Sequence, residues 1–149
     1  MRPLRRPPGG GGDAGRAIVE FIFLGILLLL PLTYLVLTLG RLQAATFSAS
    51  LAGREAGRAF VTATEDAAAH ARAQAAAGIA FDDFGFDRGA LLAVRCDGTP
   101  CLRPGGFVTV TVTIEMPLPL VPDFVAGNLP ASVSISSTHV AAVDTYVAR

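Results

Sequence analysis

The residue with the clearest chemical role is Glu20, a carboxylate inside an otherwise apolar stretch. Removing a charged side chain from water costs free energy, so an acid within a membrane segment is by default a functional candidate. Gly15 lies five residues earlier, and cleavage after it would leave Arg16 as the new N-terminus. Glu20 would then lie one helical turn from a free α-amino group. The carboxylate can neutralise that amine in its own chain or in a neighbouring subunit.

The two cysteines form a second chemical candidate. Cys96 and Cys101 bracket the turn sequence Asp-Gly-Thr-Pro at the end of a predicted strand. This spacing lets the chain turn back and bring the two Cβ atoms within disulfide range. Two metal ligands and two free thiols are the other interpretations, although no second Cys or His pair lies nearby to complete a zinc site. A disulfide here stabilises a loop and has no catalytic role.

The remaining polar residues do not assemble into an active site. All 12 basic residues are arginines, which excludes a P-loop lysine and a Schiff-base lysine. His70 and His139 lack a carboxylate or serine at a catalytic spacing, and we interpret them as surface or packing residues. Asp82, Asp83 and Asp87 do not match a calcium loop, and they are interpreted as part of a connector held by neighbouring phenylalanines. We expect no enzymatic activity, no metal and no cofactor.

The N-terminal quarter of the chain predicts a membrane anchor. From Ala17 to Leu39 run 23 largely apolar residues, and as a helix they extend about 35 Å, enough to cross a hydrocarbon core of about 30 Å. Residues 1–16 carry four arginines against one aspartate, which places the N-terminus in the cytoplasm and the residues after Gly40 outside. The alternative is a cleaved secretory signal, but the apolar run is longer than such signals normally have.

After the anchor, the chain is predicted to stay helical and rich in alanine. Between residues 41 and 77 there is no proline, and alanine, the strongest helix former, is the commonest residue. Thr62 followed by Glu65 fits a capping box, which predicts a break near residues 60–64 and a second helix from Ala63. Gly78 is the predicted C-cap of that second helix.

The last third of the chain has the signals of β-structure. Residues 90–96 predict a short apolar strand, and residues 107–116 alternate strictly between apolar and polar side chains, as in a half-buried strand. Three prolines among residues 117–122 stop that strand, and a third strand is expected at about residues 131–143. The fold class is therefore α+β, with the alanine-rich helix covering one face of a small three-stranded antiparallel sheet.

Together these signals divide the chain into four segments. We predict a basic flexible leader, a transmembrane helix, an extracytoplasmic helical segment and a small antiparallel β domain. Their ranges are 1–15, 16–40, 41–78 and 79–149, respectively. The balanced charge of 12 basic and 12 acidic residues argues against a nucleic-acid partner.

Three stretches resemble the TadE-like family of tight-adherence (Flp) pilus proteins. They are Ala14 to Phe21 with its apolar continuation, the segment Gly-Arg-Glu-Ala-Gly-Arg-Ala at residues 53–59, and the Val-Thr ladder that ends in Pro-Leu-Pro at residues 108–119. The N-terminus is similar to the class III signals of type IV prepilins and pseudopilins, and the likeness covers most of the chain from Asp13 onward. The Gly-x-x-x-x-Glu pattern alone is weakly specific, since short motifs recur by chance.

The resemblance implies a minor pilin-like subunit in the cytoplasmic membrane of a bacterium. A prepilin peptidase would cut between Gly15 and Arg16, and the partners would be other pilin-like subunits and the pilus assembly platform. The part after Gly40 is far larger than in the major Flp pilin, which argues against the main fibre subunit. The alternative is a single-pass anchor that presents an extracytoplasmic binding or sensing domain.

Overall fold

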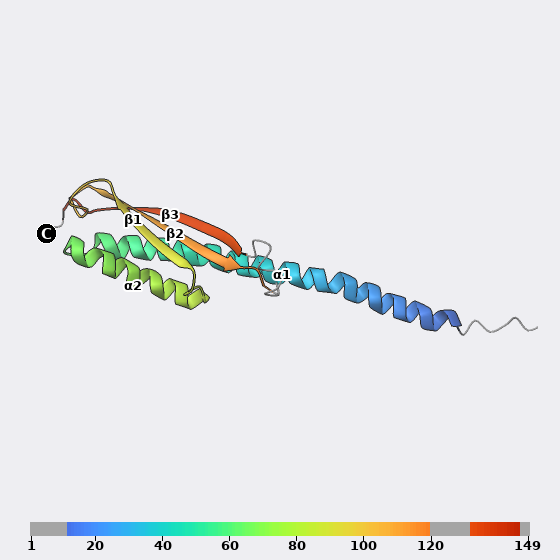
Figure 1. Cartoon of the computed structure of the whole chain (residues 1–149). Coiled ribbons are helices and arrows are strands. Elements are labelled where there is room, and N and C mark those ends of the chain that lie inside the picture. Colours follow the sequence, from blue (N-terminus) through green and yellow to red (C-terminus); the bar gives the residue numbers. More distant parts are fainter. Residues whose placement is uncertain (1–11, 120–131, 147–149) are drawn as a thin grey trace, which may run out of the picture. The chain divides into compact units, whose positions relative to one another are not determined.

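The structure is a computed structural model, and it describes residues 12–119 and 132–146. Two helices precede three strands in the chain (Figure 1). The elements are α1 (Gly12–Val61), α2 (Asp66–Phe84), β1 (Ala90–Cys96), β2 (Phe107–Pro117) and β3 (Ser132–Ala142). The chain divides into two compact units, here called the N-terminal unit (residues 1–37) and the head (residues 38–149). The predicted α+β fold with a three-stranded antiparallel sheet is confirmed.

The described part of the N-terminal unit is the first half of α1. Its side chains from Gly15 to Leu37 are exposed, apart from the half-buried Tyr34. The most apolar window of this helix has a mean hydropathy of 2.5, and none of that window is buried inside the protein. About 20 apolar residues in a helix are enough to span a bilayer. The helix is therefore long enough and apolar enough to cross a membrane, as the sequence predicted.

The sheet of the head has the order β1-β2-β3, and both pairs of neighbours are antiparallel. The central strand β2 alternates as predicted, because its inward side chains are fully buried and the threonines between them are only half-buried. The buried set is Val108, Val110, Val112, Ile114 and Met116. Strand β2 ends at Pro117, the first of the prolines expected to stop it. Residues 120–131, which include the expected start of the third strand, lie outside the described residues.

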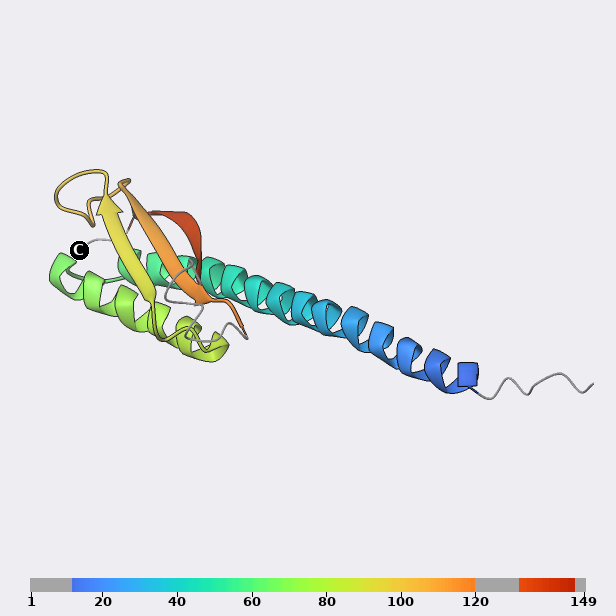
Figure 2. The ribbon, with the colours of Figure 1, turned by 45° about the vertical axis from the view of Figure 1, so that its right-hand side comes forward.

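The two helices of the head cover one face of this sheet (Figures 1 and 2). Their buried side chains are mainly alanines, with Ala49, Ala52 and Ala56 from α1 and Ala73 and Ala77 from α2. Small side chains let a helix approach its neighbours closely. The two helices are also joined directly, since the buried Ser48 hydroxyl of α1 donates a hydrogen bond of 3.2 Å to a main-chain carbonyl of α2.

Glycine is required where α1 passes β3. A Cβ atom added at Gly57 would lie 3.2 Å from the Cβ of Ala141 and 3.2 Å from Cδ2 of His139. Both distances are shorter than ordinary van der Waals contact. The missing side chain at Gly57 therefore sets how closely the helix packs on the strand.

Aromatic side chains supply most of the bulk that the alanines lack. Phe60 is 0% exposed and Phe86 is 2% exposed, and Phe81 lies with them in the same buried cluster. Burying one such ring stabilises a fold by roughly 1.5–3 kcal/mol, far more than burying a methyl group. The phenylalanines around the predicted connector thus hold it to the core, although Phe81 and Phe84 belong to the end of α2.

The end of α2 differs from the prediction. The helix continues through Gly78 and ends at Phe84, and its cap is Gly85, which adopts a left-handed conformation with φ 69°. The reason is packing, because Ala80 and Phe81 are buried against the head and extend the helical face by another turn. The predicted C-cap at Gly78 was therefore wrong.

The predicted capping box was also wrong, although the break itself lies where it was expected. Helix α1 ends at Val61, and Glu65 is the N-cap of α2 but makes no side-chain capping bond. The Thr62 hydroxyl instead donates a hydrogen bond of 2.8 Å back to the carbonyl oxygen of Arg58. The carboxylate of the next residue, Asp66, accepts hydrogen bonds from a loop that is distant in the sequence.

Candidate functional site

The predicted cleavage and assembly residues lie on one face of α1. Gly15, Arg16, Val19, Glu20 and Phe23 line one shallow, open hollow on the helix surface. Residues four apart in a helix lie one above the other, so Arg16 and Glu20 share a face, and so do Gly15 and Val19. The structure therefore places Arg16 and Glu20 one helical turn apart, the spacing expected from the sequence, and Gly15 lines the same hollow.

Glu20 has no partner in the part of the chain that the structure describes. No hydrogen bond or ion pair reaches its carboxylate, and the guanidinium of Arg16 lies beyond ion-pair distance. Its neighbours in the chain are exposed apolar residues, with Phe21 77% and Phe23 64% exposed. Arg16 is the nearest cation on this face but is not in contact with Glu20, so the carboxylate is available to bind another positive charge.

The peptide bond between Gly15 and Arg16 lies near the beginning of the helix. The first four N–H groups of a helix have no acceptor within it, so this end opens more easily than the interior. Glycine adds to this, since it costs a helix about 1 kcal/mol relative to alanine. A Cβ atom at Gly15 would meet nothing within 4 Å, so this glycine has no packing role in the structure. The bond thus lies in the part of α1 that opens most easily.

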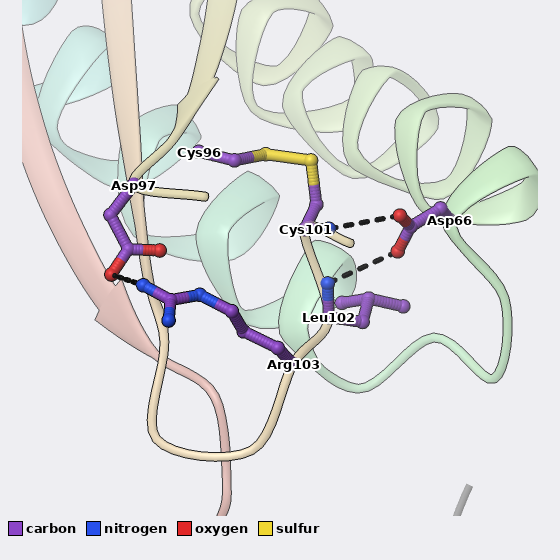
Figure 3. The surroundings of a disulfide bond; sticks show 6 residues. All are labelled: Asp66, Cys96, Asp97, Cys101, Leu102 and Arg103. Carbon is purple, nitrogen blue, oxygen red and sulfur yellow. Dashed lines mark hydrogen bonds and ion pairs between the residues drawn. A yellow bond between two sulfur atoms is a disulfide. The ribbon is translucent and has the colours of Figure 1, made fainter. Parts of the chain in front are cut away.

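The predicted disulfide is present in the head. Cys96 at the end of β1 bonds to Cys101 in the following loop, with the two Cα atoms 5.3 Å apart. Figure 3 shows the carboxylate of Asp66 reaching this loop from the start of α2. It accepts hydrogen bonds from the backbone N–H groups of Cys101 at 2.9 Å and Leu102 at 3.1 Å. Asp66 thus ties α2 to the disulfide loop.

An ion pair closes the same loop on its exposed side. A guanidinium nitrogen of Arg103 lies 2.7 Å from a carboxylate oxygen of Asp97 (Figure 3). Partial desolvation acts to raise the pKa of Asp97, but a backbone hydrogen bond from Phe107 and the charge of Arg103 outweigh it. The pKa of Asp97 therefore lies below the ordinary value for an aspartate. These contacts stabilise the loop and leave no polar group aimed at a ligand.

No sequence pattern indicates the role of Asp66. It lies 35 residues before Cys101, and a carboxylate in the first turn of a helix is usually explained by the helix dipole alone. The two histidines have packing contacts, as the sequence suggested. His70 stacks edge-on against Phe60 at 5.0 Å between ring centroids, and His139 faces Gly57.

No metal-binding cluster is found within residues 12–119 and 132–146, where no three His, Cys, Asp or Glu side chains lie close enough together. No protein-family model, curated protein or solved structure matches the chain. The resemblance noted from the sequence therefore rests on the quoted residues themselves. The candidate functional site is therefore the surface of α1 that carries Gly15, Arg16 and Glu20.

Proposed function

We propose that this chain is a minor pilin-like membrane protein, a pseudopilin of the TadE-like type, which takes part in assembling a bacterial tight-adherence pilus. Helix α1 anchors it in the cytoplasmic membrane, with the basic leader inside and the head outside. A prepilin peptidase removes residues 1–15, and the shortened chain then associates with other pilin-like subunits and the assembly platform.

The observation that carries this proposal is the unpartnered carboxylate of Glu20, one helical turn from the Gly15–Arg16 bond. Cleavage by hydrolysis splits this bond, giving the leader a new carboxyl group and Arg16 a protonated α-amino group. That amine lies on the face of α1 that holds Glu20. The carboxylate can then pair with the amine of its own chain or with that of a neighbour.

Electrostatics favour the pairing because Glu20 lies near the edge of the apolar segment. An unpaired acid at the centre of a membrane helix costs up to about 3 kcal/mol on insertion scales, and less near the interface. A neighbouring amine offsets this cost, and the low dielectric constant strengthens the attraction. Two α1 helices are thereby held side by side, with their exposed apolar side chains in contact.

Two further features support the orientation of the chain. The arginines of the leader favour the cytoplasmic side of a membrane. The disulfide of the head is typical of proteins in oxidising compartments outside the cytoplasm. Both support a head outside and a cleavage site at the inner face, where the leader is accessible.

Processing is tested by Gly15→Ala in the full-length protein expressed in its native host. The structure leaves open space for this methyl group, so the variant should insert and fold normally. We expect its N-terminus to remain uncleaved, while the matched control Gly25→Ala is processed like the wild type. Normal cleavage of Gly15→Ala would contradict the assigned site.

Assembly is tested by Glu20→Ala and by the conservative Glu20→Asp. Glu20→Ala should insert at least as well as the wild type, because it removes a charge from the apolar segment, but pilus formation should be lost. Glu20→Asp retains the charge and should retain part of the assembly. If Glu20→Ala assembles normally and the chain keeps its Met1, the single-pass anchor with a binding or sensing head is the better account.

A further inference from the structure

Among the residues that the structure describes, strand β3 is an edge of the sheet. It runs for 11 residues and contains no Asp, Glu, Lys, Arg or Pro. Natural edge strands are usually protected from pairing by charges, prolines, bulges or short length. Its inward side chains Ile135, Ser137 and His139 are only half-buried, whereas the inward residues of β2 are fully buried. The core is thus incompletely covered along this edge.

The hydrogen-bonding groups on that edge can be assigned from the ladder. The N–H of Val143 donates to the carbonyl oxygen of Gly106, so Val143 faces β2. Alternate residues of a strand point their backbone groups to opposite sides. The even-numbered residues from Ser132 to Ala142 therefore direct their N–H and C=O groups away from β2. Within the described residues, the backbone of β3 has no partner other than β2.

Strand β1 forms the opposite edge and is also incompletely covered. Its inward residues Ala90, Leu92 and Val94 are half-buried. Beside them is an open hollow between β1 and α2, lined by Gln74, Ala77, Phe81, Ala90, Leu91 and Leu92. The only charged residue of β1 is Arg95, which points to the sheet face away from the helices. This edge can accept a neighbouring strand together with an apolar side chain.

We propose that the heads associate head to tail, with the β3 edge of one copy pairing with the β1 edge of a second copy. Both strands are antiparallel to β2, so they run parallel to each other within one head. A neighbouring copy in the same orientation therefore forms a parallel β3–β1 pair, and its helices stay on the same side of the extended sheet. The occupant is a second copy, because its β1 supplies a strand edge and the apolar side chains Phe81 and Leu92 of its hollow supply cover for Ile135.

The levels of the side chains along the two edges support this pairing. Ile114 of the central strand pairs with Ala90 of β1 on one side and with Ile135 of β3 on the other, so Ala90 and Ile135 lie at the same height in the sheet. Two copies placed side by side without a shift therefore bring Ile135 of one beside the hollow at Ala90 of the next. The buried edges then carry a single charge, Arg95, which lies on the outer face and stays in water.

A two-fold pairing of β3 with β3 is opposed by the anchor, and this step alone rests on the proposed function. Antiparallel pairing would reverse α1 in the second head and place Thr38, where the head begins, at opposite ends of the pair. The head portion of α1 covers 24 residues, about 36 Å. Head-to-tail pairing keeps Thr38 of every copy at the same end, and as a heterologous interface it can add further copies, in a ring or an open filament.

The pairing is tested by cross-linking between chains in native membranes. Two differently tagged full-length variants, Leu91→Cys and Ser136→Cys, are co-expressed and treated with a short bis-maleimide, the native disulfide remaining intact. Leu91 and Ser136 both pair with Thr113 of β2, and their side chains lie on the outer face of the sheet. We expect a dimer that carries both tags, formed only on co-expression. Ala67→Cys with Ala75→Cys, exposed positions on α2, is the matched control and should give no mixed dimer.

A backbone substitution distinguishes strand pairing from mere proximity. Adding Thr138→Pro to the Ser136→Cys chain removes an N–H on the free edge and should abolish the mixed dimer, whereas Thr138→Val keeps the N–H and should preserve it. The inference is overturned if no mixed dimer forms, if Ser136→Cys alone dimerises, or if the dimer survives Thr138→Pro. A mixed dimer of chains that retain Met1 would support the pairing while contradicting the proposed processing.

Discussion

The two units of this chain place their apolar side chains in opposite environments. In the head, Phe60 and the inward residues of β2 are 0% exposed, and Ser48, the only buried polar residue among those described, is hydrogen-bonded. In the N-terminal unit, Phe21 is 77% and Leu28 is 72% exposed. The head is thus stabilised by its own contacts, whereas the apolar side chains of the N-terminal unit are not covered by the protein in the part of the chain that the structure describes.

Because of this difference, substitutions in the head and in the N-terminal unit should affect different properties. Removing a head residue should change the free energy of unfolding, which reports internal contacts. Removing a residue of the N-terminal unit should leave head stability unchanged and alter insertion, processing or assembly. The substitutions below probe that separation with the full-length protein in detergent micelles.

The largest effect is expected for Phe60→Ala compared with Phe21→Ala. Phe60 is fully buried, and truncating such a ring typically lowers the free energy of unfolding by about 3–5 kcal/mol. Phe21→Ala removes the same atoms from an exposed ring and should leave head unfolding unchanged in thermal denaturation. Equal losses in the two variants would contradict the separation of the units.

Removing the disulfide should have the next largest effect. Cys96 and Cys101 close a short loop, and such a constraint contributes about 2 kcal/mol by reducing the entropy of the unfolded chain. The double variant Cys96→Ser/Cys101→Ser should lose this amount in denaturant titration, and the wild type under reducing conditions should match it. An unchanged midpoint would show that the contacts of Asp66 alone hold the loop.

Gly57→Leu and Gly25→Leu compare the close helix–strand approach with the open helix. Side chains forced into packed sites usually cost about 1–3 kcal/mol, and a Cβ atom at Gly57 already meets Ala141 and His139. Gly25 has nothing within 4 Å, so its substitution should not lower head stability. Thermal unfolding of both variants decides this, and a stable Gly57→Leu head would contradict the described packing.

The smallest effect is expected from acid. The pKa of Asp97 is lowered in the folded head, so its contribution to stability is complete above the unfolded pKa and is lost as the pH falls through the folded pKa. Head stability should therefore decrease below about pH 4, and Asp97→Asn should reduce this dependence. Arg103→Met should reduce it in the same direction. An identical acid profile in all three proteins would exclude the ion pair as a cause.

The predictions from sequence succeeded where local pattern and burial coincide. The alternation around Val110 identifies β2, because a strand with one buried face repeats every two residues. The spacing of Cys96 and Cys101 around a turn identified the disulfide. Helical spacing placed Arg16 and Glu20 on one face of α1.

The remaining features depend on contacts between distant segments. Gly78 looked like a helix end, but burial of Phe81 against the core carries α2 further. Thr62 and Glu65 looked like a capping box, but Thr62 bonds back to Arg58. No local pattern shows that Asp66 reaches the disulfide loop or that β3 is an open edge, since both require the tertiary arrangement.

The central claim is that the Glu20 carboxylate pairs with the α-amino group that cleavage after Gly15 creates. Its most direct test is the N-terminal sequence and intact mass of the wild-type protein extracted from the membrane of its native host. The account predicts a chain that begins at Arg16 and lacks the first 15 residues. A membrane-bound chain that still begins at Met1 would contradict it.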